Sequence, residues 1–521
     1  MPSKGRILWV DDEIELLRAH VIFLEERGYT VTPVTNAEDA IELVGRQDFD
    51  MVLLDEMLNG KDGLTALGEI KEIQPSLPVV MVTKSEEESL MEEAIGGKID
   101  DYLTKPVNPS QILLTCKRIL ESNKIAGERI SRDYITEFNK ISQALLGPLD
   151  WQEWVGIYSS LCEWEIETDQ HSDLGLKQTL SDQRKECNVE FSKFIENHYP
   201  FWLNGKEQAP TLSKDLVAKY VSPHLEAKKN VVFLVLDNLR LDQFLTIEPI
   251  LYPYFKINKA YYCSILPTAT PFSRNAIFSG LFPRQIAERY PELWKQGNDD
   301  EHSLNRFERE LLNHQLKDLK LNLKPEPKYI KILDANEAKN VVKQVASYSD
   351  MPLVAIVVNF VDILAHSRSD SEVLREMTPD ESAYRSLTKS WFEHSYVLQM
   401  LKELASRQTT IVLTTDHGSV RGMRGAKVIG DRETSTNLRY KYGRSLRADP
   451  KHAILIKDPA AYQLPAMGIN TNYLLAKEDY YFVYPTNYHY YLSFYRDSLQ
   501  HGGVSMEEMI LPVATLEPKS E

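Results

Sequence analysis

Asp416 and His417 stand side by side directly after an apolar, β-branched run that begins at Ile411. Such a run is typical of a buried parallel strand, and α/β proteins place their functional polar residues at the carboxyl ends of these strands. A carboxylate and a neutral imidazole together are suitable ligands for a transition metal such as zinc. The pair alone is ambiguous, because an Asp after a strand more often caps the next helix.

Three further places after residue 229 carry Asp or His close to an apolar run. Asp362 and His366 are four residues apart, so on a helix they would share one face and could bind one ion. A helix cap followed by a surface histidine would have the same spacing. The apolar runs and the residues near them are 230–236 with Asp237, 353–359 with Asp362 and His366, and 509–513 with His501.

Thr268 and Thr270 precede Pro271, and the residues from 273 to 279 have the pattern of the first turns of a helix. A Thr hydroxyl at a helix N-terminus lies where backbone amides and the helix dipole favour an anion. An ordinary N-cap role for either threonine is the alternative. With three aspartates and three histidines, the chain has enough ligands for two zinc ions and a nucleophile between them. The metals are needed because a Thr hydroxyl is a poor nucleophile until its pKa is lowered.

In the first 120 residues, five apolar runs alternate with helical patterns. This alternation predicts a doubly wound parallel sheet with a site at the carboxyl ends of its strands. Three carboxylates that converge there would repel each other, so we expect a hard divalent cation, most simply Mg²⁺, to bind them. Lys105 could neutralise a phosphoryl group on Asp55, and Thr83 could donate a hydrogen bond to it. The runs are 6–10, 29–34, 49–54, 78–83 and 101–103, and the polar residues at their ends are Asp11, Asp12, Asp55, Thr83 and Lys105.

The segment from 122 to 228 shows no alternation of strands and helices. Apolar residues recur at helical spacing over 125–146 and 151–167, and a third helix is expected over 174–197. We expect Tyr199-Pro200 to stop that helix. No basic recognition helix is present in the pattern, so a DNA-binding output is not expected. The sequence therefore predicts three domains, at 1–121, 122–228 and 229–515.

The composition of the 521 residues is that of a globular protein, and the formal net charge of −16 argues against general affinity for nucleic acid or anionic membranes. No run of about 18 apolar residues suggests membrane insertion. Four scattered cysteines suggest neither a disulfide framework nor a cysteine zinc site. We expect a cytoplasmic protein that captures any anionic substrate locally.

Two local compositions bear on that substrate. The basic stretch 421–447 contains eight basic residues and two acidic ones, and it could attract an anion or form a solvated loop. The segment 480–495 contains nine aromatic residues. We expect strand packing to explain most of them, while one or two near His501 could stack on bases. Together the two features would suit an oligonucleotide better than a small phosphomonoester. The basic residues are Arg421, Arg424, Lys427, Arg432, Arg439, Lys441, Arg444 and Arg447.

The first segment resembles response-regulator receiver domains, through VDD at 10–12, LLDEMLNGKDG at 53–63, VTK at 82–84 and TKP at 104–106. The resemblance implies a flavodoxin-like fold and a sensor histidine kinase that phosphorylates Asp55. It further implies a magnesium ion held by Asp11, Asp12 and Asp55, a readout through Thr83, Lys105 and the rotating aromatic switch Tyr102, and a homodimer promoted by phosphorylation. Asn59 stands where the family commonly has Pro, and we expect this to alter only the loop after the phosphoacceptor.

Residues 229–515 resemble the alkaline phosphatase superfamily, especially its PglZ branch and the nucleotide pyrophosphatase/phosphodiesterases. The resemblance implies an α/β domain in which Thr270 is the nucleophile, because the family's nucleophile stands ten residues before the glycine matched by Gly280. Thr at this position argues against a sulfatase. The implied ligands are Asp237, Asp416 and His417 for one zinc ion, with Thr270 bridging toward it, and Asp362, His366 and His501 for the other.

A receiver, a helical linker and a PglZ domain in this order resemble response regulators tied to type IX secretion in Bacteroidetes. That resemblance implies activity on short or cyclic oligonucleotides. Our first hypothesis is a zinc-dependent phosphodiesterase controlled by phosphorylation of Asp55. The alternative is a signalling adaptor that binds a transcription factor or secretion component, with its zinc site structural or vestigial.

Overall fold

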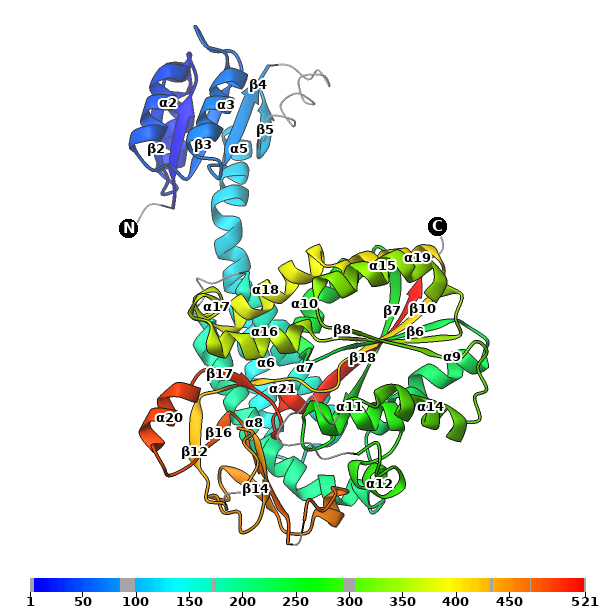
Figure 1. Cartoon of the computed structure of the whole chain (residues 1–521). Coiled ribbons are helices and arrows are strands. Elements are labelled where there is room, and N and C mark those ends of the chain that lie inside the picture. The colour runs from blue at the N-terminus through cyan, green and yellow to red at the C-terminus, as the bar shows by residue number, and fades with distance from the viewer. Residues whose placement is uncertain are drawn as a thin grey trace. The chain divides into compact units, whose positions relative to one another are not determined.

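The computed structural model describes residues 4–84, 99–170, 175–294, 305–431, 434–468 and 470–519, with the backbone alone at 121–129 and 370. The chain divides into two compact units, Met1–Thr136 and Glu137–Glu521, which are described separately below (Figure 1).

The first unit contains a five-stranded parallel sheet with the order β2-β1-β3-β4-β5. This order is that of flavodoxin-like proteins, so the predicted doubly wound fold is confirmed. All five predicted strands are present, with ends that differ by no more than two residues. The strands are β1 (Arg6–Val10), β2 (Thr30–Val34), β3 (Met51–Asp55), β4 (Val79–Thr83) and β5 (Asp101–Thr104), and the helices include α1 (Arg18–Glu25), α2 (Ala37–Arg46), α3 (Gly63–Ile73) and α5 (Pro109–Cys116).

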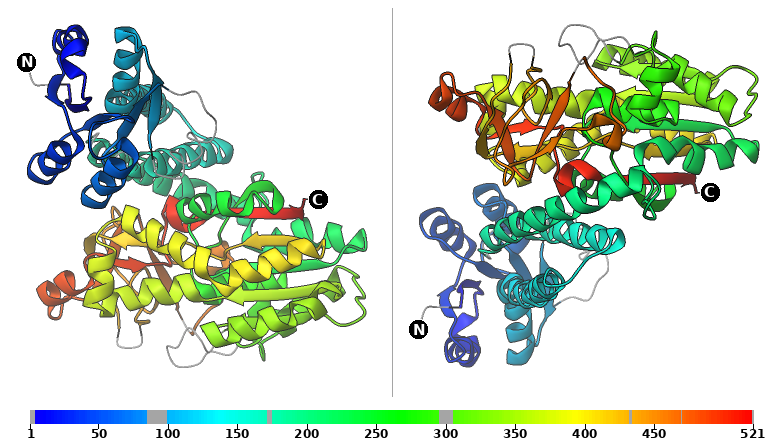
Figure 2. Two further views of the ribbon diagram at one scale, coloured as in Figure 1. Left: turned by 90° about the horizontal axis from the view of Figure 1, so that it is seen from above. Right: turned by 90° about the horizontal axis from the view of Figure 1, so that it is seen from below.

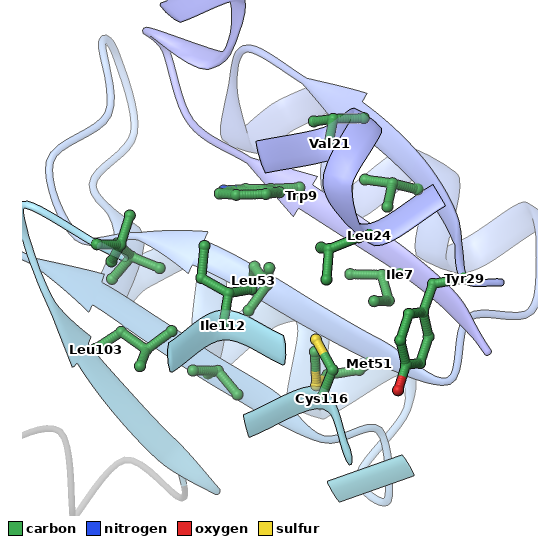
Figure 3. Packing of buried hydrophobic residues seen from close by; sticks show 14 of the residues in the cluster. Ile7, Trp9, Val21, Leu24, Tyr29, Met51, Leu53, Leu103, Ile112 and Cys116 are labelled. Atoms are coloured by element: carbon green, nitrogen blue, oxygen red, sulfur yellow. The ribbon is translucent and has the colours of Figure 1, made fainter. Parts of the chain in front are cut away.

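Both faces of this sheet are covered by apolar side chains from the helices. On one face Trp9 and Leu53 of the sheet pack with Ile112 and Cys116 of α5 (Figure 3). The other face packs against α2 and α3. Since both faces are buried, the strands are almost continuously apolar, and polar side chains are confined to the strand ends where a site can form.

The second unit begins within α6 (Ser122–Ala144) and continues through α7 (Trp151–Asp169) and α8 (Leu176–Leu203). These three helices confirm the predicted helical linker. The expected stop at Tyr199-Pro200 is wrong, because α8 continues to Leu203 with Pro200 inside it. Proline lacks the amide that would donate to the Glu196 carbonyl, so Pro200 removes one hydrogen bond of α8 without ending the helix.

A six-stranded sheet, with the order β7-β18-β10-β6-β9-β8, forms the centre of the second unit. Strands β10, β6, β9 and β8 are parallel, and β18 is antiparallel to β10 and β7. Helices cover both faces, with α15 and α19 on one and α11 and α14 on the other (Figures 1 and 2). The strands are β6 (Val231–Leu236), β7 (Phe255–Cys263), β8 (Lys328–Ile332), β9 (Leu353–Val358), β10 (Thr410–Thr414) and β18 (Ile510–Pro518).

This sheet confirms the expected α/β domain. None of the helices in the described ranges is long and apolar enough to cross a membrane. The helices of this part are α9 (Ser222–Glu226), α10 (Leu241–Leu251), α11 (Thr270–Ser279), α12 (Pro283–Arg289), α14 (Glu308–Asp318), α15 (Ala335–Ser349), α16 (Phe360–Asp370), α17 (Glu372–Met377), α18 (Glu381–His394) and α19 (Tyr396–Ser406).

Short strands and two small helices follow β10 and precede β18. They form the pairs β11-β17 and β12-β16 and the three-stranded sheet β13-β15-β14. Their bounds are β11 (Val420–Gly422), β12 (Arg424–Lys427), β13 (Tyr440–Gly443), β14 (Ala453–Ile456), β15 (Asn472–Ala476), β16 (Tyr480–Val483), α20 (Tyr488–Tyr495), β17 (Ser498–Gln500) and α21 (Met506–Met509).

Candidate metal centres

Asp237 and Asp416 come together at the carboxyl edge of the large sheet. Strands β6 and β10 are adjacent and parallel, with Thr414 opposite Val235, so the residues after both strands meet at one edge. Asp237, Asp416 and His417 are all fully buried. Their ligand atoms lie within 4.8 Å of one another.

The two carboxylates present one oxygen each to the same point. Within the described part of the chain, Asp237 Oδ1 and Asp416 Oδ2 have no hydrogen-bond partner, and each lies 3.7 Å from His417 Nε2. The other oxygens are occupied: Asp416 Oδ1 accepts from the backbone amides of Asn238 and His417 at 3.3 and 3.1 Å. A buried carboxylate oxygen without a donor is costly unless a cation satisfies it. Two oxygens and one imidazole nitrogen are a donor set that fits zinc.

Thr270 is the first residue of α11, and its hydroxyl oxygen lies 3.0 Å from His417 Nε2. The N-cap alternative is wrong for both threonines, because the N-cap residue is Ala269 and no side chain caps the helix. Thr268 accepts from the amide of Gly502 at 3.1 Å and donates to the carbonyl of Gly503 at 2.8 Å. The two hydroxyls are thus distinguished, since Thr268 holds a loop and Thr270 faces the Asp-His cluster.

Asp362, His366 and His501 form a second cluster of possible ligands. Asp362 lies in the first turn of α16 and His366 one turn later, while His501 follows β17. His366 Nε2 lies 3.4 Å from Asp362 Oδ1 and 3.3 Å from His501 Nε2. The rings of His417 and His501 stack with centroids 4.2 Å apart, so the two clusters are neighbours.

Burial and charge act differently on the groups of these clusters. Burial, followed by the charge of Asp237, raises the pKa of the Asp416 carboxyl well above its ordinary value. Burial lowers the pKa of His417, which keeps its imidazole neutral and able to bind a metal. For Asp362 burial acts upward, but the hydrogen bond and charge of His366 and the charge of His501 lower its pKa below the ordinary value.

Two residues that the sequence did not single out complete this region. Asn238 has a left-handed backbone (φ 64°), and its side chain donates to Asp362 Oδ1 at 3.1 Å while its amide reaches Asp416. Arg274 donates to Asp237 Oδ2 at 2.6 Å. Asn238 could have been predicted from its place directly after a strand-end Asp, because Asn adopts the positive φ of a tight turn more readily than most residues. Arg274 lies one helical turn after Thr270, which was a weaker signal.

In the first unit Asp11, Asp12 and Asp55 also form a cluster with ligand atoms within 4.8 Å of one another. Lys105 donates to Asp11 and Asp55 at 2.8 and 2.6 Å. Burial raises the pKa of the Asp55 carboxyl, although Lys105 acts in the opposite direction. Burial also acts against the charge of Lys105, but its hydrogen bonds to the two carboxylates raise its pKa above the ordinary value. The ammonium therefore stays charged beside Asp55.

The other predicted receiver residues take different positions around that cluster. Thr83 donates to Glu56, and Tyr102 is 43% exposed. The expectation that Asn59 affects only its own loop is wrong. Its side-chain amide donates to Asp12 Oδ2 at 2.7 Å, so it contacts one of the expected magnesium ligands.

Half of the basic stretch 421–447 is used to hold the fold together. Arg421 pairs with Asp497, and Arg424 pairs with Glu478 and Asp479. The other two members of this half are buried: Arg439 bonds Glu508, and Lys441 donates to the carbonyl of Ser435 at 2.8 Å. Lys427, Arg444 and Arg447 are exposed, and Arg432 lies outside the described residues. The stretch is therefore neither one basic patch nor a simple solvated loop.

The aromatic segment is also divided between two roles. Tyr481 and Phe482 are buried in β16, as expected for strand packing. The expectation that strands account for most of the aromatics is wrong, since five of the nine lie on α20. Tyr490 and Phe494 are 63% and 54% exposed and stack on each other with centroids 5.9 Å apart.

Known protein families match all three parts of the chain. A response regulator receiver domain matches residues 7–117, a PorX response regulator linker domain matches 124–203, and a BREX system PglZ alkaline phosphatase-like domain matches 216–516. The alginate biosynthesis transcriptional regulatory protein AlgB of Pseudomonas syringae pv. tomato is 36% identical over 124 residues, and the transcriptional regulatory protein ResD of Bacillus subtilis is 32% identical over 118 residues.

The similarities to these individual proteins cover about a quarter of this chain and less than half of each relative. The matches span 24% of this chain and 28% of AlgB, and 23% of this chain and 49% of ResD. Similar solved structures include a CheY-like receiver from Methanospirillum hungatei, with 27% identity, a TM-score of 0.22, and coverage of 23% of this chain and 96% of that one. The receiver domain of NtrX from Brucella abortus has 32% identity, a TM-score of 0.21, and coverage of 22% and 98%.

A receiver followed by a helical linker and an alkaline phosphatase-like domain defines a response regulator with an alkaline phosphatase-like output. The chain belongs to the PglZ family, whose model matches more than half of it, and its architecture is PorX-type. Receiver domains and alkaline phosphatase-like domains typically bind divalent metals.

Proposed function

We propose that the chain is a two-component response regulator whose output domain is a zinc-dependent phosphodiesterase with Thr270 as nucleophile. The observation that carries this proposal is the Thr270 hydroxyl, 3.0 Å from His417 Nε2, beside two buried carboxylate oxygens that accept no hydrogen bond in the described structure. Asp237, Asp416 and His417 would hold one zinc ion, and Asp362, His366 and His501 the other. Asp11, Asp12 and Asp55 would hold Mg²⁺.

The reaction is an in-line displacement in two steps. The Thr270 hydroxyl gives its proton to water as its oxygen attacks phosphorus, and the bond to the leaving oxygen breaks, that oxygen taking a proton from water. The product is a phosphodiester of Thr270, which water then hydrolyses to release the phosphomonoester and restore the hydroxyl. Zinc ions bound at the two clusters would lower the pKa of the hydroxyl and stabilise the charge on the entering and leaving oxygens. The amide groups at the start of α11 favour the anionic phosphate at Thr270.

We infer an oligonucleotide, short or cyclic, as the substrate class. The exposed cations Lys427, Arg444 and Arg447 support an anionic substrate, and the exposed rings of Tyr490 and Phe494 support bases that stack. Phosphorylation of Asp55 by a histidine kinase would promote a homodimer and change the activity of the output domain. We place the protein in the cytoplasm, with domain boundaries near residues 121 and 228 and a role in type IX secretion.

The test is hydrolysis of a bis-aryl phosphate by the full chain loaded with zinc. Thr270→Ala should lower kcat/KM by at least about a thousandfold, because it removes the nucleophile. Thr270→Ser keeps a hydroxyl and should retain part of the activity. In the wild type, acid quenching during turnover should trap one phosphoryl group on the peptide that contains Thr270. Equal rates for wild type and Thr270→Ala would remove Thr270 from this role.

A signalling adaptor is the second candidate function, favoured by the exposed aromatic surface of α20. A transcription factor or a secretion component would then bind the output domain, and zinc would be structural or absent. Metal content separates the two: a purified chain without zinc, and without hydrolysis when zinc is added, supports the adaptor. Two zinc ions per chain and a diesterase activity lost in Thr270→Ala support the enzyme.

A further inference from the structure

Arg274 is a buried arginine that contacts the Asp-His cluster without being one of its expected ligands. Its side chain is 1% exposed and lies one turn of α11 after Thr270. Nη1 donates to Asp237 Oδ2 at 2.6 Å and lies 3.7 Å from Asp416 Oδ2. On its other edge, Nε donates to Glu308 Oε1 at 2.6 Å. Arg274 therefore links the cluster to a carboxylate that stands behind it.

The hydrogen bond from Arg274 decides which oxygen of Asp237 remains for a metal. Oδ2 is occupied by the guanidinium, whereas Oδ1 faces His417 and has no hydrogen-bond partner in the described structure. A carboxylate with one oxygen bound to the guanidinium is held in one orientation, which turns Oδ1 toward His417 and disfavours binding of one ion by both oxygens. Partners of this kind orient metal ligands, and their loss weakens metal binding about 10- to 100-fold.

Glu308 holds the arginine in place and balances its charge. It lies in α14, is 1% exposed, and accepts a hydrogen bond from the Tyr329 hydroxyl as well as from Arg274. A buried guanidinium next to a metal site would repel the metal unless a carboxylate compensated it. Glu308 supplies that compensation on the side of Arg274 away from Asp237.

We propose that Arg274, anchored by Glu308, is a positioning residue that keeps Asp237 a one-oxygen ligand and so fixes the coordination of the ion beside Thr270. This inference rests on the proposed function, because it concerns the same zinc site. The inference also explains why the residue is an arginine, because the planar guanidinium donates to Glu308 through Nε and to Asp237 through Nη1. Lysine, with a single ammonium, cannot hold both carboxylates in that geometry.

The experiment compares the full-length wild type with Arg274→Gln and Arg274→Lys. Zinc affinity is measured on the metal-free protein by competition with a chelating dye. Co²⁺ is then substituted, since its visible absorption is stronger in four-coordinate than in five- or six-coordinate sites. Arg385→Gln is the matched control: Arg385 is also a buried arginine, but its partners Glu165, Asp169 and Asp242 belong to neither ligand cluster.

We expect both Arg274 variants to bind zinc about 10- to 100-fold more weakly at one of the two sites. Their Co²⁺ absorption should be weaker and shifted, because Asp237 becomes free to bind through both oxygens. The Arg385 control should lose stability while keeping wild-type zinc affinity and Co²⁺ absorption. Should Arg274→Gln fail to fold, Arg274→Lys keeps the charge and carries the comparison.

Two different results would overturn the inference. If an Arg274 variant has wild-type zinc affinity and an unchanged Co²⁺ spectrum, Arg274 has only a structural role while the proposed function stands. If the wild type itself binds neither zinc nor Co²⁺ tightly, the proposed function fails, and the inference fails with it.

Discussion

Arg439 allows a sharp test of whether the basic stretch serves the substrate or the fold. Its guanidinium is fully buried and donates to Glu508 through Nη2 at 2.5 Å and Nε at 3.2 Å. Glu508 also accepts from the amide of Gly503 at 2.8 Å, two residues after His501. The arginine thus supports the loop that carries a proposed zinc ligand.

Arg439→Leu should destabilise the protein by about 3–5 kcal/mol, the cost of breaking a buried ion pair and leaving one charge unpaired. The surface offers a matched control in the bidentate pair Arg289–Asp318, with bonds of 2.7 and 2.9 Å and exposed fractions of 49% and 43%. Arg289→Leu should cost less than about 1 kcal/mol, because water replaces the interaction.

Urea unfolding followed by tryptophan fluorescence measures both variants. Six of the seven tryptophans lie in the unit Glu137–Glu521, so the signal reports the part that contains both pairs. Adding Glu508→Leu to Arg439→Leu should recover part of the loss, since no charge then remains buried and unpaired. Equal and small losses for Arg439→Leu and Arg289→Leu would refute the structural assignment of Arg439.

Three further perturbations have defined outcomes. Asn59→Ala should tighten Mg²⁺ binding to the receiver roughly two- to tenfold, measured by calorimetric titration. The reason is that Asp12 is released from a hydrogen bond worth about 0.5–1.5 kcal/mol. Unchanged or weaker binding would contradict this. Asp497 is partly buried, but hydrogen bonds from its two arginine partners lower its pKa below 3.8. The ionised carboxylate should therefore stabilise the fold above that pH, and this stabilisation should be lost as the pH falls through the lowered pKa. In urea unfolding at several pH values, the free energy of unfolding should fall less at acid pH for Asp497→Asn than for the wild type. Gly418→Ala would place a Cβ atom 2.0 Å from the Glu507 carbonyl oxygen. We expect this variant to lose about 1–3 kcal/mol of the free energy of unfolding and to bind one zinc ion fewer per chain in metal analysis. Full zinc content would contradict this.

The strands of both sheets were predictable because buried parallel strands are continuous apolar runs with polar residues at their ends. The run before Asp55 and the run before Asp237 illustrate this, since each is fully buried and each ends where a ligand cluster begins. The end of α8 was harder to predict, because a proline inside a helix removes one hydrogen bond but does not always end the helix. The helix α20 could not be predicted from the aromatic segment, because closely spaced aromatic residues are compatible with a strand as well as with a helix.

Most residues that offer metal ligands could be found from the sequence because they lie at a strand end or start a helix, and His366 lies one turn after Asp362 on the same helix. Their supporting residues could not, because the contacts join segments far apart in the chain. Arg274 meets Glu308 across 34 residues, and Asn238 meets Asp362 across 124 residues. The same limit applies to the basic stretch. A count of its charges predicts attraction for anions, but it does not predict that Arg439 forms a buried ion pair with Glu508.

The segment 504–508 shows why the linker helices and the proposed metal sites depend on each other. Asn188 of α8 donates to the Glu507 carboxylate at 3.0 Å and accepts from the amide of Met506 at 2.8 Å. The backbone of Glu507 packs against Gly418, next to His417, while Glu508 holds the loop after His501. One short segment therefore supports a ligand of each cluster and is itself held by a helix more than 300 residues earlier in the chain. We expect a displacement of α8 to disturb the supports of both histidines, so a signal that acts on the linker would reach the proposed reaction at Thr270.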